Sequence, residues 1–209
     1  MNSNNLAPSR EEAENIFLWA YEKNPEPWAK HCRAVARVAE EIALKSDLNP
    51  EKAYIFGLFH DIGYYAYESG KGSTCHIYFG YELMMEKGYE TAAKICLTHS
   101  FPIQDFTTYS GSDMYCNDEQ KTFITSFLSE AVYDDYDKLI MLSDCLGTAQ
   151  GIVTMDKRNI DIVMRKGFNE NTLKVWSAYY GLKDYFDKKC GMNIYNLFFN
   201  EIKNSTFGL

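Results

Sequence analysis

A histidine and an aspartate stand side by side in GLFHDIGYY, residues 57–65, where an apolar run ends. Both side chains are costly to bury unless a partner compensates for the water they lose. A third polar group in an apolar setting is Asp144, in LIMLSDCLG. Any one of these groups could be a core residue with an internal hydrogen bond. Together with the four histidines of the chain they suit a shared transition-metal centre, the histidines being His31, His60, His76 and His99.

The elements expected to position these residues are helices. WAKHCRAVARVAEEIALKSD repeats apolar residues at spacings of three, four and seven, which places His31 on a buried helix face. Asn49 predicts the start of the next helix and Gly63 its end. His76 opens a further helix and His99 closes another. No segment alternates as a strand does, so the sequence predicts an all-α fold.

The composition is that of a single globular domain. The chain has 209 residues, of which 46% are hydrophobic, and a formal net charge of −8, which argues against nucleic-acid binding through a basic surface. The polar start predicts no signal peptide, and the short apolar runs predict no membrane span. We therefore expect a cytoplasmic protein. A homo-oligomer remains an open alternative. We expect an N-terminal helix and linker (1–27), a metal-binding core (28–150) and C-terminal helices that complete the same domain (151–209).

The cysteines show no pattern typical of a disulfide framework, although Cys75 beside His76 leaves a soft zinc site open as an alternative. None of them forms a C-x-x-C pair, and their spacing is irregular. Reduced thiols are therefore expected for all six, which are Cys32, Cys75, Cys96, Cys116, Cys145 and Cys190.

The order H…HD…D, centred on FHDIG, resembles the HD-domain superfamily of metal-dependent phosphohydrolases. HCRAVARVAEEIA is similar to the helix that carries the family's first ligand, and KLIMLSDCLG to the helix that carries its last. The resemblance covers roughly residues 28–150 and implies an HD-domain helical bundle with additional C-terminal helices. It implies a metal held by four side chains, which are His31, His60, Asp61 and Asp144.

A subset of the superfamily has the order H…HD…H…H…D and holds two metals. HIYFGYELM and AAKICLTHS are similar to the helices that carry the two additional histidines in that subset. The resemblance then implies that His76 and His99 hold a second metal, with Asp61 as the bridge. It implies one or two divalent transition metals (iron, manganese, nickel, cobalt or zinc), with two favoured.

The resemblance also implies a reaction. Metal-activated hydroxide would cleave a phosphate mono- or diester, with a nucleotide as the expected substrate and Asp61 as the catalytic residue. Tyr64 follows HDIG where many relatives carry lysine, and THSFPIQD lacks the GYP signature of cyclic-dinucleotide phosphodiesterases. Two alternatives remain open: an HD-type di-iron oxygenase with the same ligands, and a non-enzymatic metal-dependent ligand sensor.

Substrate-binding residues are less clearly marked. Lys71, in GKGST, lies between Asp61 and His76 along the chain and is the leading candidate for a phosphate contact, although a solvated loop lysine is at least as common. Further candidates are Thr74, Ser100 and, less favoured, Lys138.

Residues 100–117, SFPIQDFTTYSGSDMYCN, form the longest stretch without helix periodicity. Loops of this length inside compact domains are uncommon and often functional. We expect this stretch to border the metal pocket, with Tyr109 or Tyr115 facing a substrate. The alternative is a surface excursion unrelated to the site.

Overall fold

The computed structural model describes residues 7–25, 27–67, 74–109 and 115–207. Helices make up nearly all of the regular structure in these residues, and the all-α prediction is confirmed. The strands found there are β1 (Gly147–Thr148) and β2 (Gly151–Ile152), an antiparallel pair that is too short to leave an alternating pattern in the sequence. Among the described helices, none has the length and apolar character needed to cross a membrane.

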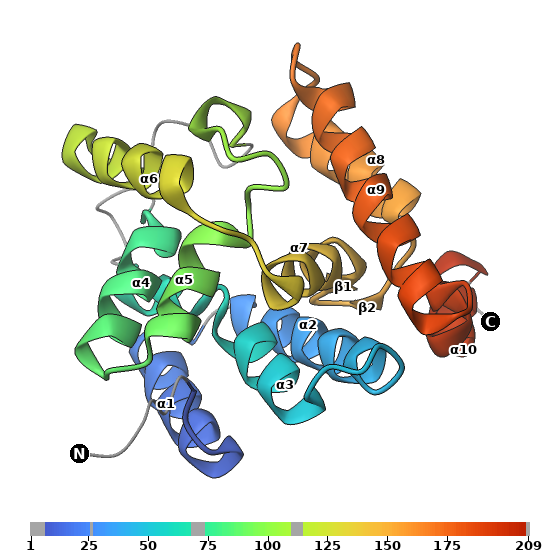
Figure 1. Cartoon of the computed structure of the whole chain (residues 1–209), viewed down its shortest axis with the longest axis horizontal. Coiled ribbons are helices and arrows are strands. Elements are labelled where there is room, and N and C mark those ends of the chain that lie inside the picture. The colour runs from blue at the N-terminus through green and yellow to red at the C-terminus, as the bar shows by residue number, and fades with distance from the viewer. Residues whose placement is uncertain (1–6, 26, 68–73, 110–114, 208–209) are drawn as a thin grey trace.

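Three helices form the centre of the molecule. α2 (Trp28–Ala43) packs along α3 (Pro50–Phe59), and α7 (Asp135–Leu146) packs on both of them (Figure 1). The predicted start of α3 is confirmed, because the Asn49 side chain accepts a hydrogen bond of 3.0 Å from the backbone N–H of Lys52. This cap fixes where α3 begins and therefore which residues stand at its other end.

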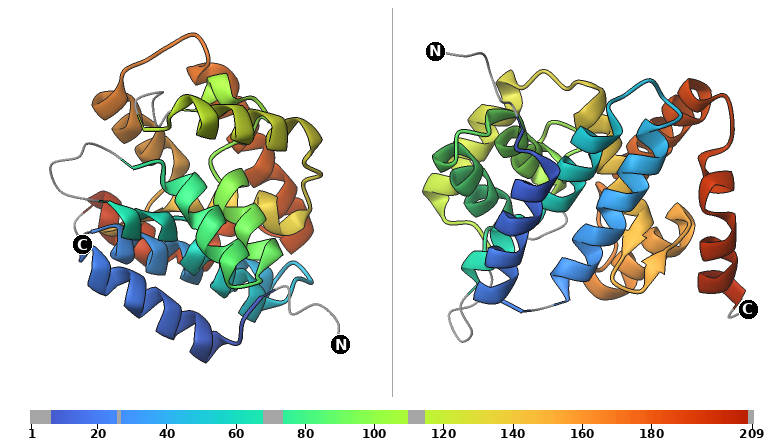
Figure 2. Two further views of the ribbon diagram at one scale, coloured as in Figure 1. Left: turned by 90° about the vertical axis from the view of Figure 1, so that its left-hand side faces the viewer. Right: turned by 90° about the horizontal axis from the view of Figure 1, so that it is seen from below.

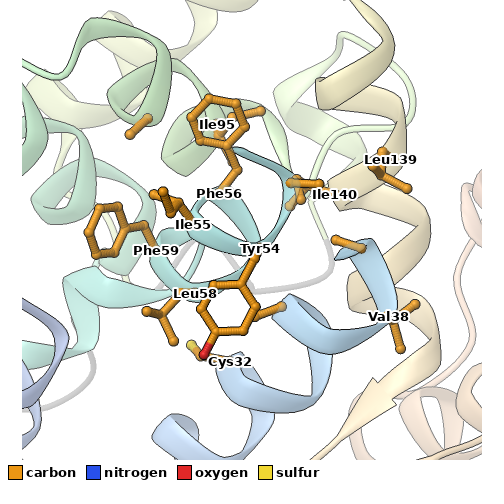
Figure 3. Packing of buried hydrophobic residues seen from close by; sticks show 14 of the residues in the cluster. Cys32, Val38, Tyr54, Ile55, Phe56, Leu58, Phe59, Ile95, Leu139 and Ile140 are labelled. Carbon is orange, nitrogen blue, oxygen red and sulfur yellow. The ribbon is translucent and has the colours of Figure 1, made fainter. Parts of the chain in front are cut away.

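After its first turn, the helix α3 is buried on all sides from Ala53 to Phe59. Figure 3 shows Tyr54, Phe56 and Phe59 leaving the helix in different directions, and each of them is at least nine-tenths buried. A helix that is apolar all round is stable only inside a core. Its C-terminal end consequently delivers His60 and Asp61 into the interior of the molecule.

The N-terminal helix and the short segment that follows α3 cover one side of the core. α1 (Arg10–Lys23) follows its N-cap Ser9 and packs against α3 and the short helix η1 (Ile62–Ala66). The expected end of the third helix at Gly63 is wrong, because α3 ends at Phe59 and Gly63 lies within η1. The turn that ends α3 lies inside an apolar run of the sequence, so no local residue pattern marks the end of the helix.

A second hydrophobic cluster lies under the helices α4 (His76–Glu86), α5 (Glu90–Thr98) and α6 (Asp118–Glu130). Ile77 and Leu97 join the first two helices within this cluster, and η2 (Phe106–Thr108) packs beside α6. The cluster contains Phe101 and Cys116 together with Cys75, so the two described ends of the expected loop, 100–109 and 115–117, lie close to the start of α4.

One disulfide contradicts the expectation of reduced thiols throughout. Cys75 and Cys116 are bonded to each other, with Cα atoms 4.8 Å apart, although 41 residues separate them in the chain. The second hydrophobic cluster contains both residues and brings the chain before α4 beside the chain before α6. This meeting is set by packing, so the spacing of the cysteines did not reveal it. The free cysteines are Cys32, Cys96, Cys145 and Cys190.

The remaining helices stand on the other side of α7. α8 (Met155–Lys166) and α9 (Thr172–Cys190) both pack on α7 and rise together beyond it (Figure 1). η3 (Ile194–Phe198) then leads into α10 (Phe199–Phe207). Figure 2 shows α1 and α10 on opposite flanks of α2.

Candidate metal centre

Every imidazole of the chain reaches one point in the interior. His31 comes from α2 and His60 caps the C-terminal end of α3, with Asp61 directly after it. His76 is the first residue of α4, and His99 caps the C-terminal end of α5. Asp144 lies in the last turn of α7. The sequence placed these six residues on helix faces and helix ends, and the folded chain brings all six together.

The carboxylate of Asp61 lies between two pairs of imidazoles. Its Oδ2 atom is 3.6 Å from the Nε2 atoms of both His31 and His60. Its Oδ1 atom is 3.0 Å from Nε2 of His76 and 3.3 Å from Nε2 of His99. The two oxygens of one carboxylate therefore face two different histidine pairs, which is the arrangement that a bridging ligand needs.

Asp144 completes the first of these two groups. Its Oδ1 atom is 3.0 Å from Nε2 of His31 and 3.9 Å from Nε2 of His60. The ligand atoms of His60, His99 and Asp144 also lie within 4.8 Å of one another, as do those of Asp61, His76 and His99. Asp144 therefore belongs to the same compact cluster as the histidines.

Gly63 allows the two halves of the cluster to approach. A Cβ atom at this position would lie 1.8 Å from the backbone oxygen of His76 and 2.5 Å from the backbone nitrogen of Gly80. Only a residue without a side chain fits this contact between η1 and α4. The glycine of HDIG thus sets the distance between Asp61 and His76.

Backbone carbonyls orient three of the imidazoles. Nδ1 of His31 lies 3.1 Å from the carbonyl of Gly147, and Nδ1 of His60 lies 2.7 Å from that of Gly57. Nδ1 of His99 lies 3.0 Å from the carbonyl of Cys96. A carbonyl accepts only from a protonated Nδ1, so each Nε2 presents its lone pair to the cluster.

His76 is held in another way. The ring of Tyr64 stacks on its imidazole, with centroids 4.4 Å apart and planes inclined by 9°. Tyr64 is the residue that stands where many HD-domain relatives carry lysine, and here it supports a histidine.

Electrostatics keeps the carboxylates charged and His60 neutral. Burial lowers the pKa of His60 to about 4, despite the attraction of Asp61. Burial acts to raise the pKa of Asp144, but the neighbouring His31 outweighs it, helped by His60 and Arg158, and lowers that pKa. Burial likewise acts to raise the pKa of Asp61, but the surrounding histidines, His60 and His76 first among them, hold it well below its usual range. A neutral imidazole and ionised carboxylates are the forms that bind metals.

These residues fit a transition-metal site on chemical grounds. Imidazole nitrogens and carboxylate oxygens suit iron, manganese, cobalt, nickel and zinc. Asp61 Oδ1 is buried and makes no well-directed hydrogen bond within the described residues. Buried carboxylate oxygens without a partner are rare in native structures and call for an explanation such as an ion. The cluster could hold one metal through His31, His60, Asp61 and Asp144, and a second through Asp61, His76 and His99.

The cluster lies at the wall of a cavity of about 400 Å³. Ser100, Tyr109 and Tyr115 line this cavity, so the flanks of the 100–117 stretch border the metal centre as predicted. The tip of the stretch, residues 110–114, lies outside the described residues. The alternative of an unrelated surface excursion is wrong for these flanks.

The other substrate-binding candidates have different positions. Lys71 lies outside the described residues. Thr74 is half-buried just before α4 and is not among the residues that line the cavity, in contrast to Ser100. Lys138 is also absent from that lining and pairs with Asp135 at 3.4 Å.

Sequence reasoning missed the basic wall of the cavity. Arg158, Arg165 and Lys166 of α8 all line it, together with apolar and aromatic residues of α8 and α9. RNIDIVMRK does show basic residues at helical spacing. Nothing local indicates that this helix packs back against α7, so the charge pattern alone could equally mark a solvated face.

Comparisons with known proteins agree with this geometry. The family model of the HD domain matches residues 28–149, a range that contains all six residues of the metal cluster. Neither the curated proteins nor the solved structures gave a match. The matched range is more than half of the chain and includes the adjacent His60 and Asp61, so the chain belongs to the HD-domain family.

Proposed function

We propose that the protein is a metal-dependent phosphohydrolase that cleaves a phosphate mono- or diester, with a nucleotide as the expected substrate. The observation that carries the proposal is the carboxylate of Asp61, which faces two imidazole pairs beside a cavity with a basic wall. HD domains are typically phosphohydrolases, and a cavity of about 400 Å³ accommodates a small phosphorylated molecule.

The residues of the chain have distinct tasks in this proposal. The carbonyls of Gly57, Cys96 and Gly147 fix three imidazoles with Nε2 toward the metal cluster. Asp61 and Asp144 stay ionised at neutral pH, because neighbouring histidines lower their pKa. Divalent metals at these ligands would supply a water-derived nucleophile at neutral pH and offset the charge of the phosphoryl oxygens.

The alternatives from the sequence use the same ligands. A di-iron oxygenase would need dioxygen, and a ligand sensor would bind its ligand without turnover. The basic residues along one side of the cavity favour an anionic substrate and hence the phosphohydrolase.

The test is hydrolysis of a panel of nucleotides and simple phosphate mono- and diesters by metal-loaded protein, with all products identified, measured with and without oxygen. A phosphohydrolase cleaves at least one substrate at equal rates under both conditions, releasing phosphate from a monoester or a monoester from a diester. Turnover that requires oxygen would identify an oxygenase. Tight binding of a nucleotide with no product in either atmosphere would identify a sensor.

A further inference from the structure

One face of α8 forms a wall of the metal cavity. Arg158, Asn159, Ile162 and Lys166 all line the cavity and follow one another at helical spacing. This helix lies beyond the range that the HD-domain family model matches, which ends at residue 149. The wall is therefore a feature that this chain adds to the shared metal-binding core.

Two side chains of this wall carry donors with no acceptor. Nε of Arg158 and Nδ2 of Asn159 are buried and have no hydrogen-bond partner among the described residues. The Asn159 side chain belongs to a residue that is only 3% exposed. Leaving such donors unpaired is unfavourable, so their presence beside a cavity indicates a ligand that accepts hydrogen bonds.

Arg158 also stands next to the metal ligands. Its terminal nitrogen lies 3.6 Å from Oδ1 of Asp144, a distance too long for a hydrogen bond. Asp144 thus attracts the guanidinium without using its donors. A group bound at the metal centre lies within reach of those donors.

Lys166 adds a second positive charge at the edge of the same cavity. Its side chain is exposed, yet partial burial of the ammonium lowers its pKa, and repulsion by Arg165 acts in the same direction. Attraction by Asp144 and Asp61 opposes that shift. Arg165 itself is paired with Asp161 at 2.8 Å.

We propose that Arg158, Asn159 and Lys166 form an anion-binding wall that takes the non-bridging oxygens of a phosphoryl group held at the metal centre. The inference rests on the proposed phosphohydrolase function and specifies how its substrate is held. A guanidinium and an amide offer N–H groups in fixed directions, which suits a tetrahedral oxyanion. The lysine supplies charge at the entrance.

The test measures binding of inorganic phosphate to metal-loaded protein by isothermal titration calorimetry, with metal content determined on the same samples. Arg158→Gln and Lys166→Gln each remove one positive charge from the wall. Loss of a charge-assisted hydrogen bond should weaken phosphate binding by about tenfold or more for Arg158→Gln. Lys166→Gln, at an exposed position, should weaken it less and leave folding intact. Lys157→Gln is the matched control, because it removes a charge from an exposed neighbour on α8 that does not line the cavity.

Four outcomes decide the matter. Weaker phosphate binding in both wall variants, at unchanged metal content and with an unaffected control, supports the proposal. Unchanged phosphate binding in both variants overturns the proposal. It is also overturned if Arg158→Gln protein loses metal but binds phosphate normally once the metal is restored, because Arg158 would then only support the metal ligand Asp144. If wild-type protein hydrolyses phosphate esters in either case, the proposed function stands while the wall is rejected. If wild-type protein binds no phosphate and hydrolyses no ester, the proposed function itself fails.

Discussion

Asp61 differs from the other buried acids of the chain in having imidazoles on both sides of its carboxylate. Oδ2 faces His31 and His60, whereas Oδ1 faces His76 and His99. An aspartate that only formed hydrogen bonds would use its oxygens as acceptors, but Oδ1 accepts no well-directed hydrogen bond within the described residues. Hydrogen bonding alone therefore does not explain the position of Asp61. The residue is therefore expected to serve two metals, whereas each histidine serves one.

Asp61→Ala is expected to lose turnover and bound metal together. The loss of metal affinity should exceed the roughly 10–100-fold that follows from removing a group that only orients a ligand. His99→Ala removes a ligand from one histidine pair only and should retain one metal. Metal analysis of the purified variants, together with turnover of the best phosphate ester, measures this. Asp184→Ala, at an exposed position on α9, is the control. Normal turnover by Asp61→Ala would rule out metal-dependent hydrolysis at this site.

The metal-free protein should lose stability as the pH falls from about 6.5 to 4. Burial lowers the pKa of His60 to about 4 in the folded state, so in this window the unfolded chain binds a proton that the folded protein does not. The expected decrease is roughly 3 kcal/mol. The folded state lowers the pKa values of Asp61 and Asp144, so the stability that these carboxylates contribute is lost only below about pH 4. The folded state raises the pKa of His99, so the stability that His99 contributes is fully present below about pH 6.5 and does not change within this window.

Urea unfolding of chelator-treated protein at several pH values measures this effect. In His60→Gln the decrease between pH 6.5 and 4 should be absent, because the titrating ring is gone. Equal unfolding free energies of the wild-type protein at both ends of the window would contradict the buried, neutral state of His60.

At the scale of the elements, a buried ion pair joins two helices that carry ligands. Lys94 of α5 lies 2.5 Å from Asp137 of α7, and the Thr98 hydroxyl donates to the same carboxylate at 2.7 Å. Asp137 is fully buried and also accepts from the backbone N–H of Asp134 in the capping box of α7. These contacts fix the end of α5, with His99, against α7.

Asp137→Ala is expected to destabilise the protein by about 3 kcal/mol, because it leaves the Lys94 ammonium and the Thr98 hydroxyl without their carboxylate. Asp161→Ala removes an equal charge from an exposed pair with Arg165 and should change stability by less than about 1 kcal/mol. Denaturant unfolding of both variants gives the comparison. Similar values for the two would mean that the α5–α7 contact is not held by this pair.

The disulfide ties the chain before α4 to the chain before α6. Closing a loop across a separation of 41 residues should stabilise the folded state by about 4 kcal/mol through the entropy of the unfolded chain. Reduction of the wild-type protein should lower the unfolding free energy by that order, whereas Cys75→Ser/Cys116→Ser protein should not respond to reductant. Cys190→Ser, which changes a free thiol, should behave as the wild type. Wild-type unfolding that is insensitive to reductant would argue against the bond.

For the whole molecule, the sequence predicted what is encoded locally. The cap at Asn49 and the apolar face around His31 each lie within a few residues, and they indicated helices that the structure confirms. Contacts between distant segments gave no such signal. The bond between Cys75 and Cys116 and the packing of α8 on α7 depend on how complete helices pack. Basic residues of the cavity wall were missed for this reason.

Metal removal tests the molecule as a unit, because the cluster draws ligands from five helices or helix ends. A metal that binds only the folded chain stabilises it by about 2.7 kcal/mol at a free concentration of 100 times its Kd. For a chain of 209 residues this corresponds to an increase in Tm of about 5–10 °C. Calorimetry of chelator-treated protein before and after adding manganese measures the shift. Asp61→Ala should show a much smaller increase, since its two histidine pairs lack their shared carboxylate. Equal Tm values for metal-free and metal-loaded wild-type protein would mean that the cluster does not bind the metal in the folded state.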